Sequence, residues 1–104
     1  MIKNYELMVI VSPKLSADDA DKANQELLTW VEENGGEIDS TDPWGKRTLA
    51  YPIDKMTEGY YYVNNFKLEA TSVKVLSRLM NINEKIIRHM FVLKTPKEES
   101  NGRP

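Results

Sequence analysis

The chain of 104 residues contains no cysteine and a single histidine, which narrows the chemistry it can perform. Without cysteine there is no disulfide, no thiolate nucleophile and no cysteine-ligated metal, which suits a reducing compartment. The histidine, His89, lies beside Met90 and Phe91, so a structural place in a sheet is favoured over catalysis. A metal site needs convergent ligands and a triad needs a nucleophile beside its base, and the sequence offers neither pattern. We expect no enzyme activity, no metal and no cofactor.

Long apolar runs and glycine-rich loops are also missing. No segment has the length of a membrane span, and the N-terminus lacks the apolar core of a signal peptide. Gly35-Gly36 follows a predicted helix instead of preceding one, so it does not form a phosphate-binding loop. These absences predict a cytoplasmic protein with no membrane partner and no small-molecule substrate.

Basic residues are not in excess. The chain has 16 acidic and 14 basic residues and a net charge of −2, unlike a protein that binds RNA mainly through counterion release. Any RNA contact must come from a local group of cations or from a partner's charge. Asp18, Asp19 and Asp21 resemble a metal-binding cluster, but a helix dipole already explains acids in a first helical turn. Hydrophobic residues make up 40% of the chain, which indicates one globular domain.

Hydrophobic periodicity predicts six elements. They are a strand at 5–11, a helix from Ser16 to Asn34-Gly35-Gly36, a strand at 37–53, a strand at 60–68, a helix capped by Thr71 or Ser72 that ends near 81–83, and a strand at 84–94. Pro43 interrupts the second strand and cannot donate to a ladder, so we expect an edge strand with a bulge. In its second half, Leu49, Tyr51 and Ile53 are expected in the core.

The order β-α-β-β-α-β predicts an α+β, ferredoxin-like sandwich, in which two helices cover one face of a four-stranded antiparallel sheet. The domain is expected over residues 1–95, with a flexible charged tail at 96–104. The fold assigns no function. It includes acylphosphatases, but their site needs an arginine in a glycine-rich loop after the first strand. Ser12-Pro13-Lys14-Leu15 lacks both features.

RNA-recognition motifs share this fold and stack bases on aromatic residues of the third strand. The segment 58–65 matches their pattern at Gly59, Tyr60 and Val63 but departs from it at Glu58 and Asn65. A stand-alone single-strand RNA-binding domain that stacks bases on Tyr60 and Tyr62 is therefore the alternative function.

The segment Trp44–Ile53 is the most distinctive part of the sequence, because a glycine and two cations lead directly into a patterned strand. An opening Tyr-Glu strand, this GxR-x-LAYPI block, a Gly-Tyr strand and a closing Arg-x-Met-x-Val strand together resemble the family of the sixth protein of the bacterial small ribosomal subunit. The resemblance spans about Lys3 to Lys94. It implies binding to the central domain of small-subunit ribosomal RNA, jointly with the eighteenth small-subunit protein, without any reaction. Thr48 and Ile87 depart from the family pattern, because relatives often carry a basic residue at these positions. We therefore expect fewer direct RNA contacts here.

Two groups of residues are the candidate sites. Each cation lies at a strand start, at an exposed turn or on the face of the sheet away from the helices, where a long side chain can reach a phosphate or sugar. With Tyr5, the candidate RNA-binding residues are Lys3, Lys46, Arg47 and Arg88. The second group follows from strand parity: if Leu7, Val9 and Val11 face the helices, their neighbours form an uncovered apolar patch. The candidate partner-binding residues are Met8, Ile10, Tyr61, Val63 and Met90.

Overall fold

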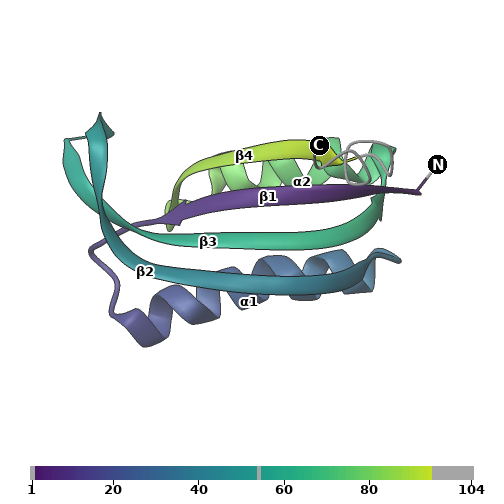
Figure 1. The fold of residues 1–104 in the computed structure, drawn as a ribbon, viewed down its shortest axis with the longest axis horizontal. Helices are drawn as coiled ribbons and strands as arrows, with labels where there is room; N and C mark the ends of the chain where they lie inside the picture. The colour runs from purple at the N-terminus through teal and green to yellow at the C-terminus, as the bar shows by residue number, and fades with distance from the viewer. Residues whose placement is uncertain (1, 54, 95–104) are drawn as a thin grey trace, which may run out of the picture.

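The computed structural model describes residues 2–53 and 55–94, and its six elements follow the predicted order. They are β1 (Ile2–Val11), α1 (Ala17–Glu33), β2 (Glu37–Ile53), β3 (Met56–Glu69), α2 (Ala70–Ile82) and β4 (Ile86–Lys94). All pairings are antiparallel, and the strand order is β2-β3-β1-β4. Both helices lie on the same side of the sheet, α1 behind β2 and β3 and α2 behind β1 and β4 (Figure 1). The predicted ferredoxin-like fold is confirmed. The predicted tail at 96–104 lies outside the described residues.

The helix boundaries test the capping predictions. Ser16 is the N-cap of α1, and its side chain accepts a hydrogen bond from the backbone N–H of Asp19. Asn34 ends this helix, and Gly35 follows in the left-handed region with φ +85°. The prediction for α2 was wrong, because Glu69 occupies its N-cap position and makes no side-chain cap bond. The helix begins directly where β3 ends, which leaves no turn in which a threonine or serine cap could sit.

One face of the sheet forms the core with the helices. In β1, Leu7, Val9 and Val11 are fully buried, as strand parity predicts. Phe66 and Leu68 of β3 join them, and the helices add their apolar faces. The helix residues in this core cluster are Ala20, Ala23, Leu27, Val31, Leu76 and Met80. Among residues 2–53 and 55–94, no helix covers the opposite face of the sheet, which we call the open face (Figure 1).

The second strand is an edge strand with irregular pairing, as its proline predicts. Its register with β3 shifts between Ile38 and Ser40, between Pro43 and Gly45, and again between Thr48 and Ile53. The far ends of β2 and β3 extend past β1 and curl out of the plane of the sheet (Figure 1). Gly59 lies where β3 passes β1, and a Cβ atom there would clash with Ile10 Cγ2. Glycine at this position lets the hairpin approach the open face closely.

Candidate interaction surface

The open face of the sheet has a polar end. Lys67 donates to Asp39 with a Nζ to Oδ1 distance of 2.9 Å. Asn65 donates to the Ser40 hydroxyl at 3.1 Å and accepts from Lys94 at 2.6 Å. These groups therefore already have partners within the protein.

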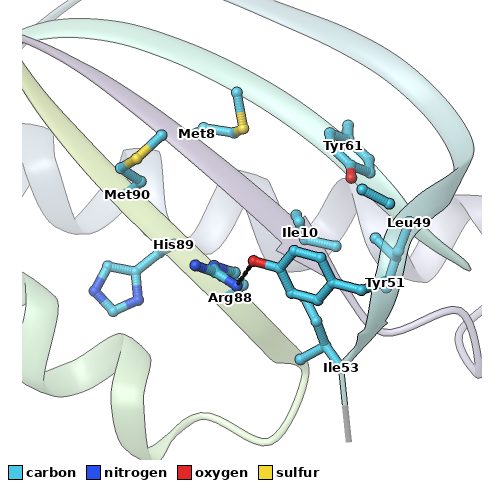
Figure 2. Close-up of a pocket in the computed structure, with 10 residues that line it drawn as sticks. Met8, Ile10, Leu49, Tyr51, Ile53, Tyr61, Arg88, His89 and Met90 are labelled. Carbon is cyan, nitrogen blue, oxygen red and sulfur yellow. Dashed lines mark hydrogen bonds between the residues drawn. The ribbon is translucent and has the colours of Figure 1, made fainter. Parts of the chain in front are cut away.

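The other end of this face is apolar and hollowed. The hollow has a volume of about 190 Å³ and lies beneath the curled end of β2 (Figure 2). It is lined by Met8, Ile10, Leu49, Ala50, Tyr51, Ile53, Tyr61, Arg88, His89 and Met90. Sites for drug-sized ligands and cofactors typically hold about 300–1,000 Å³. This hollow therefore fits an inserted side chain better than a cofactor.

Arg88 and Tyr51 close one side of the hollow. The Arg88 guanidinium donates to the Tyr51 hydroxyl at 2.9 Å and lies 5.8 Å from the centre of the ring (Figure 2). Tyr51 is 57% exposed, so the prediction that it belongs to the core was wrong. Past the bulges in β2, the strand stands over the open face, and its alternate side chains no longer point into the helix-covered core.

The predicted partner-binding residues share one face but differ in exposure. The register pairs Met8 with both Val63 and Met90, and Ile10 with Tyr61. Met90 is 52% exposed and Met8 and Tyr61 are half-buried, whereas Ile10 and Val63 are buried despite lying on the open face. Sequence reasoning missed some exposed apolar surface here. Val92 is exposed two residues after Met90 on the same face, and continued strand parity would have found it.

The predicted cations do not form one cluster. Arg88 lies opposite Ile10 and Arg47 lies opposite Gly59, so both belong to the open side of the sheet. Lys46 lies opposite Tyr60, and its Nζ sits 5.2 Å from the centre of that ring, on the helix-covered side. Lys3 pairs with the buried Leu68 at the far end of β1.

An aromatic contact that sequence reasoning missed supports Arg47. The Trp44 and Tyr61 rings are stacked, with 6.3 Å between centroids and 7° between planes. The Trp44 indole N–H donates to an Asp42 carboxylate oxygen at 3.0 Å. Arg47 Nε donates to the Trp44 carbonyl at 3.0 Å, and its guanidinium carbon lies 5.9 Å from the indole centre. Strand parity could not reveal this contact, because Trp44 is the extra residue at a bulge.

Three aromatic residues proposed for RNA contact face the core instead. Tyr5 is buried against Phe66 and Phe91, because odd-numbered residues of β1 point toward the helices. Tyr60 and Tyr62 are 9% and 4% exposed. Burial raises the pKa of Tyr62 well above its ordinary value, and its hydrogen bond to the Asp21 carboxylate adds to this. None of these rings offers a face to a base, which contradicts the RNA-recognition-motif alternative.

His89 occupies the structural place predicted for it. It pairs with Val9, lies edge-on to Phe91, and has Nε2 2.9 Å from the Ser77 hydroxyl of α2. Burial lowers its pKa, because desolvation disfavours the imidazolium form. Within residues 2–53 and 55–94, no three histidine or acidic side chains gather as metal ligands, and no helix is long and apolar enough to cross a membrane.

Comparison with known proteins identifies the family. A sequence profile described as Ribosomal protein S6 matches residues 4–93. The chain belongs to the ribosomal protein S6 family. Small ribosomal subunit protein bS6 of Carboxydothermus hydrogenoformans is 39% identical over 92 residues, which cover 88% of this chain and 96% of the relative. Its counterpart in Dictyoglomus turgidum is 40% identical over 92 residues, which cover 88% and 95%.

A solved structure agrees with this assignment. The crystal structure of 30S ribosomal protein S6 from Thermotoga maritima superimposes with a TM-score of 0.87 at 25% identity, over 98% of this chain and 96% of the other. The family resemblance inferred from the GxR-x-LAYPI block is therefore confirmed. Membership makes the chain a protein of the small ribosomal subunit.

Proposed function

We propose that this chain is a structural, non-enzymatic component of the small subunit that binds the central domain of small-subunit ribosomal RNA together with the eighteenth small-subunit protein. The observation that carries the proposal is the apolar hollow on the uncovered sheet face, with Met90 and Val92 exposed beside it. Exposed apolar surface of this kind, next to polar groups, marks a protein-binding surface.

The positions of the cations indicate how the RNA contacts are shared between the two proteins. Of the four predicted RNA-binding cations, Arg47 and Arg88 lie on the open side of the sheet, and Arg88 already contacts Tyr51. One or two phosphate contacts give only weak RNA binding. A protein partner seated in the apolar hollow adds its own cations, so the pair binds RNA more tightly than either chain alone.

Filter binding tests this proposal directly. A central-domain ribosomal RNA fragment is titrated with this chain, with the eighteenth protein, and with an equimolar mixture. We expect tight binding by the mixture and weak binding by this chain alone. Equal affinity of this chain with and without the partner would contradict the proposal. A fragment from another ribosomal RNA domain is the control for non-specific binding.

A further inference from the structure

We propose that Trp44 is a positioning residue that holds the Arg47 side chain so that its two terminal amino groups bind one phosphate of the RNA backbone. This inference rests on the proposed function and deepens it, because it assigns the chemistry of one RNA contact and the residue that orients it. Trp44 was not among the predicted site residues.

Two contacts hold the side chain of Trp44 in place. Its ring is stacked on Tyr61 of the neighbouring strand, and its indole N–H is bonded to Asp42 two residues earlier. Gly45 follows with φ +80°, a left-handed conformation that glycine adopts without strain. The Trp44 carbonyl therefore has a defined direction although it belongs to a bulge at the edge of the sheet.

That carbonyl orients the guanidinium of Arg47. It accepts a hydrogen bond from Nε at 3.0 Å, while the guanidinium carbon lies 5.9 Å from the indole centre. A cation over an indole ring is stabilised by about 0.5–1 kcal/mol at an exposed site. Two contacts thus restrict a side chain that would otherwise lose considerable rotamer entropy when it binds.

The terminal amino groups of Arg47 remain free. Within the described part of the chain, Arg47 has no ion pair and no hydrogen bond besides the one from Nε. The nearby Asp42 carboxylate accepts from the indole N–H instead. Because Nε already donates to the Trp44 carbonyl, the two terminal amino groups of the guanidinium are the donors that can bind a ligand. Two parallel N–H donors match two oxygens of a phosphate.

Charge and position favour a phosphate over a base. A guanidinium at an exposed turn can reach the backbone without any base being unstacked, and phosphate contacts set register without carrying sequence information. Direct stacking of a base on the indole ring of Trp44, which is 43% exposed, is the competing possibility. If a base stacks on Trp44, Trp44→Leu should lower the affinity for RNA without changing the salt dependence of binding, because stacking releases no counterion.

The experiment combines a double-mutant cycle with a salt titration. The complete chain, with the eighteenth protein present, is titrated onto the central-domain RNA fragment at several salt concentrations. The variants are Arg47→Ala, Trp44→Leu and the double substitution. Arg78→Ala, an exposed arginine of α2 on the helix side, is the matched control. Arg47→Ala should weaken binding about tenfold and lower the salt slope by about one unit. Trp44→Leu should lower the slope in the same direction, and the double variant should lose little more than Arg47→Ala alone.

Other results would overturn the inference. Additive losses with an unchanged slope for Trp44→Leu would mean that the indole stacks on a base. An unchanged affinity for Trp44→Leu would mean that Arg47 orients itself. Trp44→Phe guards against a folding defect, since its ring can still stack on Tyr61, and it should bind within about threefold of the parent.

A second measurement separates this inference from the proposed function. NMR of the chain without RNA measures how fast the Arg47 Nε–H proton exchanges with solvent. This proton should be protected from exchange in the parent and in Arg78→Ala, and the protection should be lost in Trp44→Leu. If the unsubstituted chain together with the eighteenth protein does not bind the RNA at all, the proposed function fails. If Nε–H is unprotected in the parent, the positioning role fails whether or not RNA binds.

Discussion

Asn24 of α1 and Asn64 of β3 form a reciprocal pair of side-chain amides in the interior of the domain. Each Nδ2 donates to the other Oδ1, at 3.1 Å and 2.9 Å, and the residues are 3% and 0% exposed. We predict that replacing either one strongly destabilises the fold. In Asn64→Leu both hydrogen bonds are lost, and the Asn24 amide remains buried without its partner.

The expected magnitude follows from these two terms. Two neutral hydrogen bonds stabilise the fold by about 1 kcal/mol each. Leaving the Asn24 amide buried without a partner costs about 1–3 kcal/mol of desolvation, which overlaps in part with the lost hydrogen bonds. The free energy of unfolding should therefore fall by roughly 2–4 kcal/mol, against about 5–15 kcal/mol for a typical domain. The melting temperature should fall by about 4–8 °C for each kcal/mol in a domain of this size.

Urea denaturation of the parent and four variants measures this loss of stability. Asn24→Leu and Asn64→Leu should each be strongly destabilised. The double variant should lose much less than the sum of the two, because it leaves no unpaired amide. Asn65→Leu, at the next position but half-exposed on the polar end, is the matched control and should lose less than about 1 kcal/mol. Additive losses in the double variant would refute the reasoning.

Three further predictions concern separate parts of the molecule. Gly36→Ala should cost about 3 kcal/mol or more by urea denaturation, since its Cβ would lie 2.5 Å from Val31 Cγ1 and 2.7 Å from the Lys67 carbonyl oxygen. Gly35→Ala meets no atom within 4 Å, so its cost should be limited to the strain of alanine at φ +85°, about 1–2 kcal/mol. Met90→Asp should abolish association with the eighteenth protein in a pull-down, while its melting temperature stays near that of the parent. The control is Ile82→Asp, at an exposed side chain at the end of α2, which should leave association intact. Because burial lowers the pKa of His89, the unfolded state binds the proton more tightly, so stability should be constant above the ordinary pKa of about 6.5 and fall as the pH drops toward the folded value. The urea midpoint between pH 5 and 8 should show this fall, and His89→Phe should flatten it; an equal fall in both proteins would assign it to other groups.

The fold was predictable because each signal was local. The Ser16 cap, the glycines after α1 and the proline in β2 each specify backbone geometry within a few residues. Strand parity also assigned the two faces of β1 correctly, since alternation of side chains is a property of the strand itself. The predicted cap of α2 failed because β3 runs directly into that helix, and this depends on the length of the strand.

The candidate site was less predictable because it depends on contacts between distant segments. The curl of the β2–β3 hairpin brings Leu49 and Tyr51 over the open face, and no periodicity in β2 specifies that curl. The same curl accompanies the burial of Ile10, which parity alone placed on an exposed patch. Trp44 was missed because its role depends on a bulge and on a ring from the neighbouring strand.

The net negative charge of the chain does not oppose RNA binding, because the charge is unevenly distributed. Helix α1 carries six acidic residues and one basic residue, a net charge of −5, so the rest of the chain carries +3 of the total of −2. All six acids are exposed on the helix-covered side. A helix with its side chains is about 10–12 Å across, and the Debye length is about 8 Å at physiological salt. A phosphate at the open side would therefore be largely screened from the charge of α1, so the acidic composition does not by itself oppose the phosphate contacts proposed for Arg47 and Arg88.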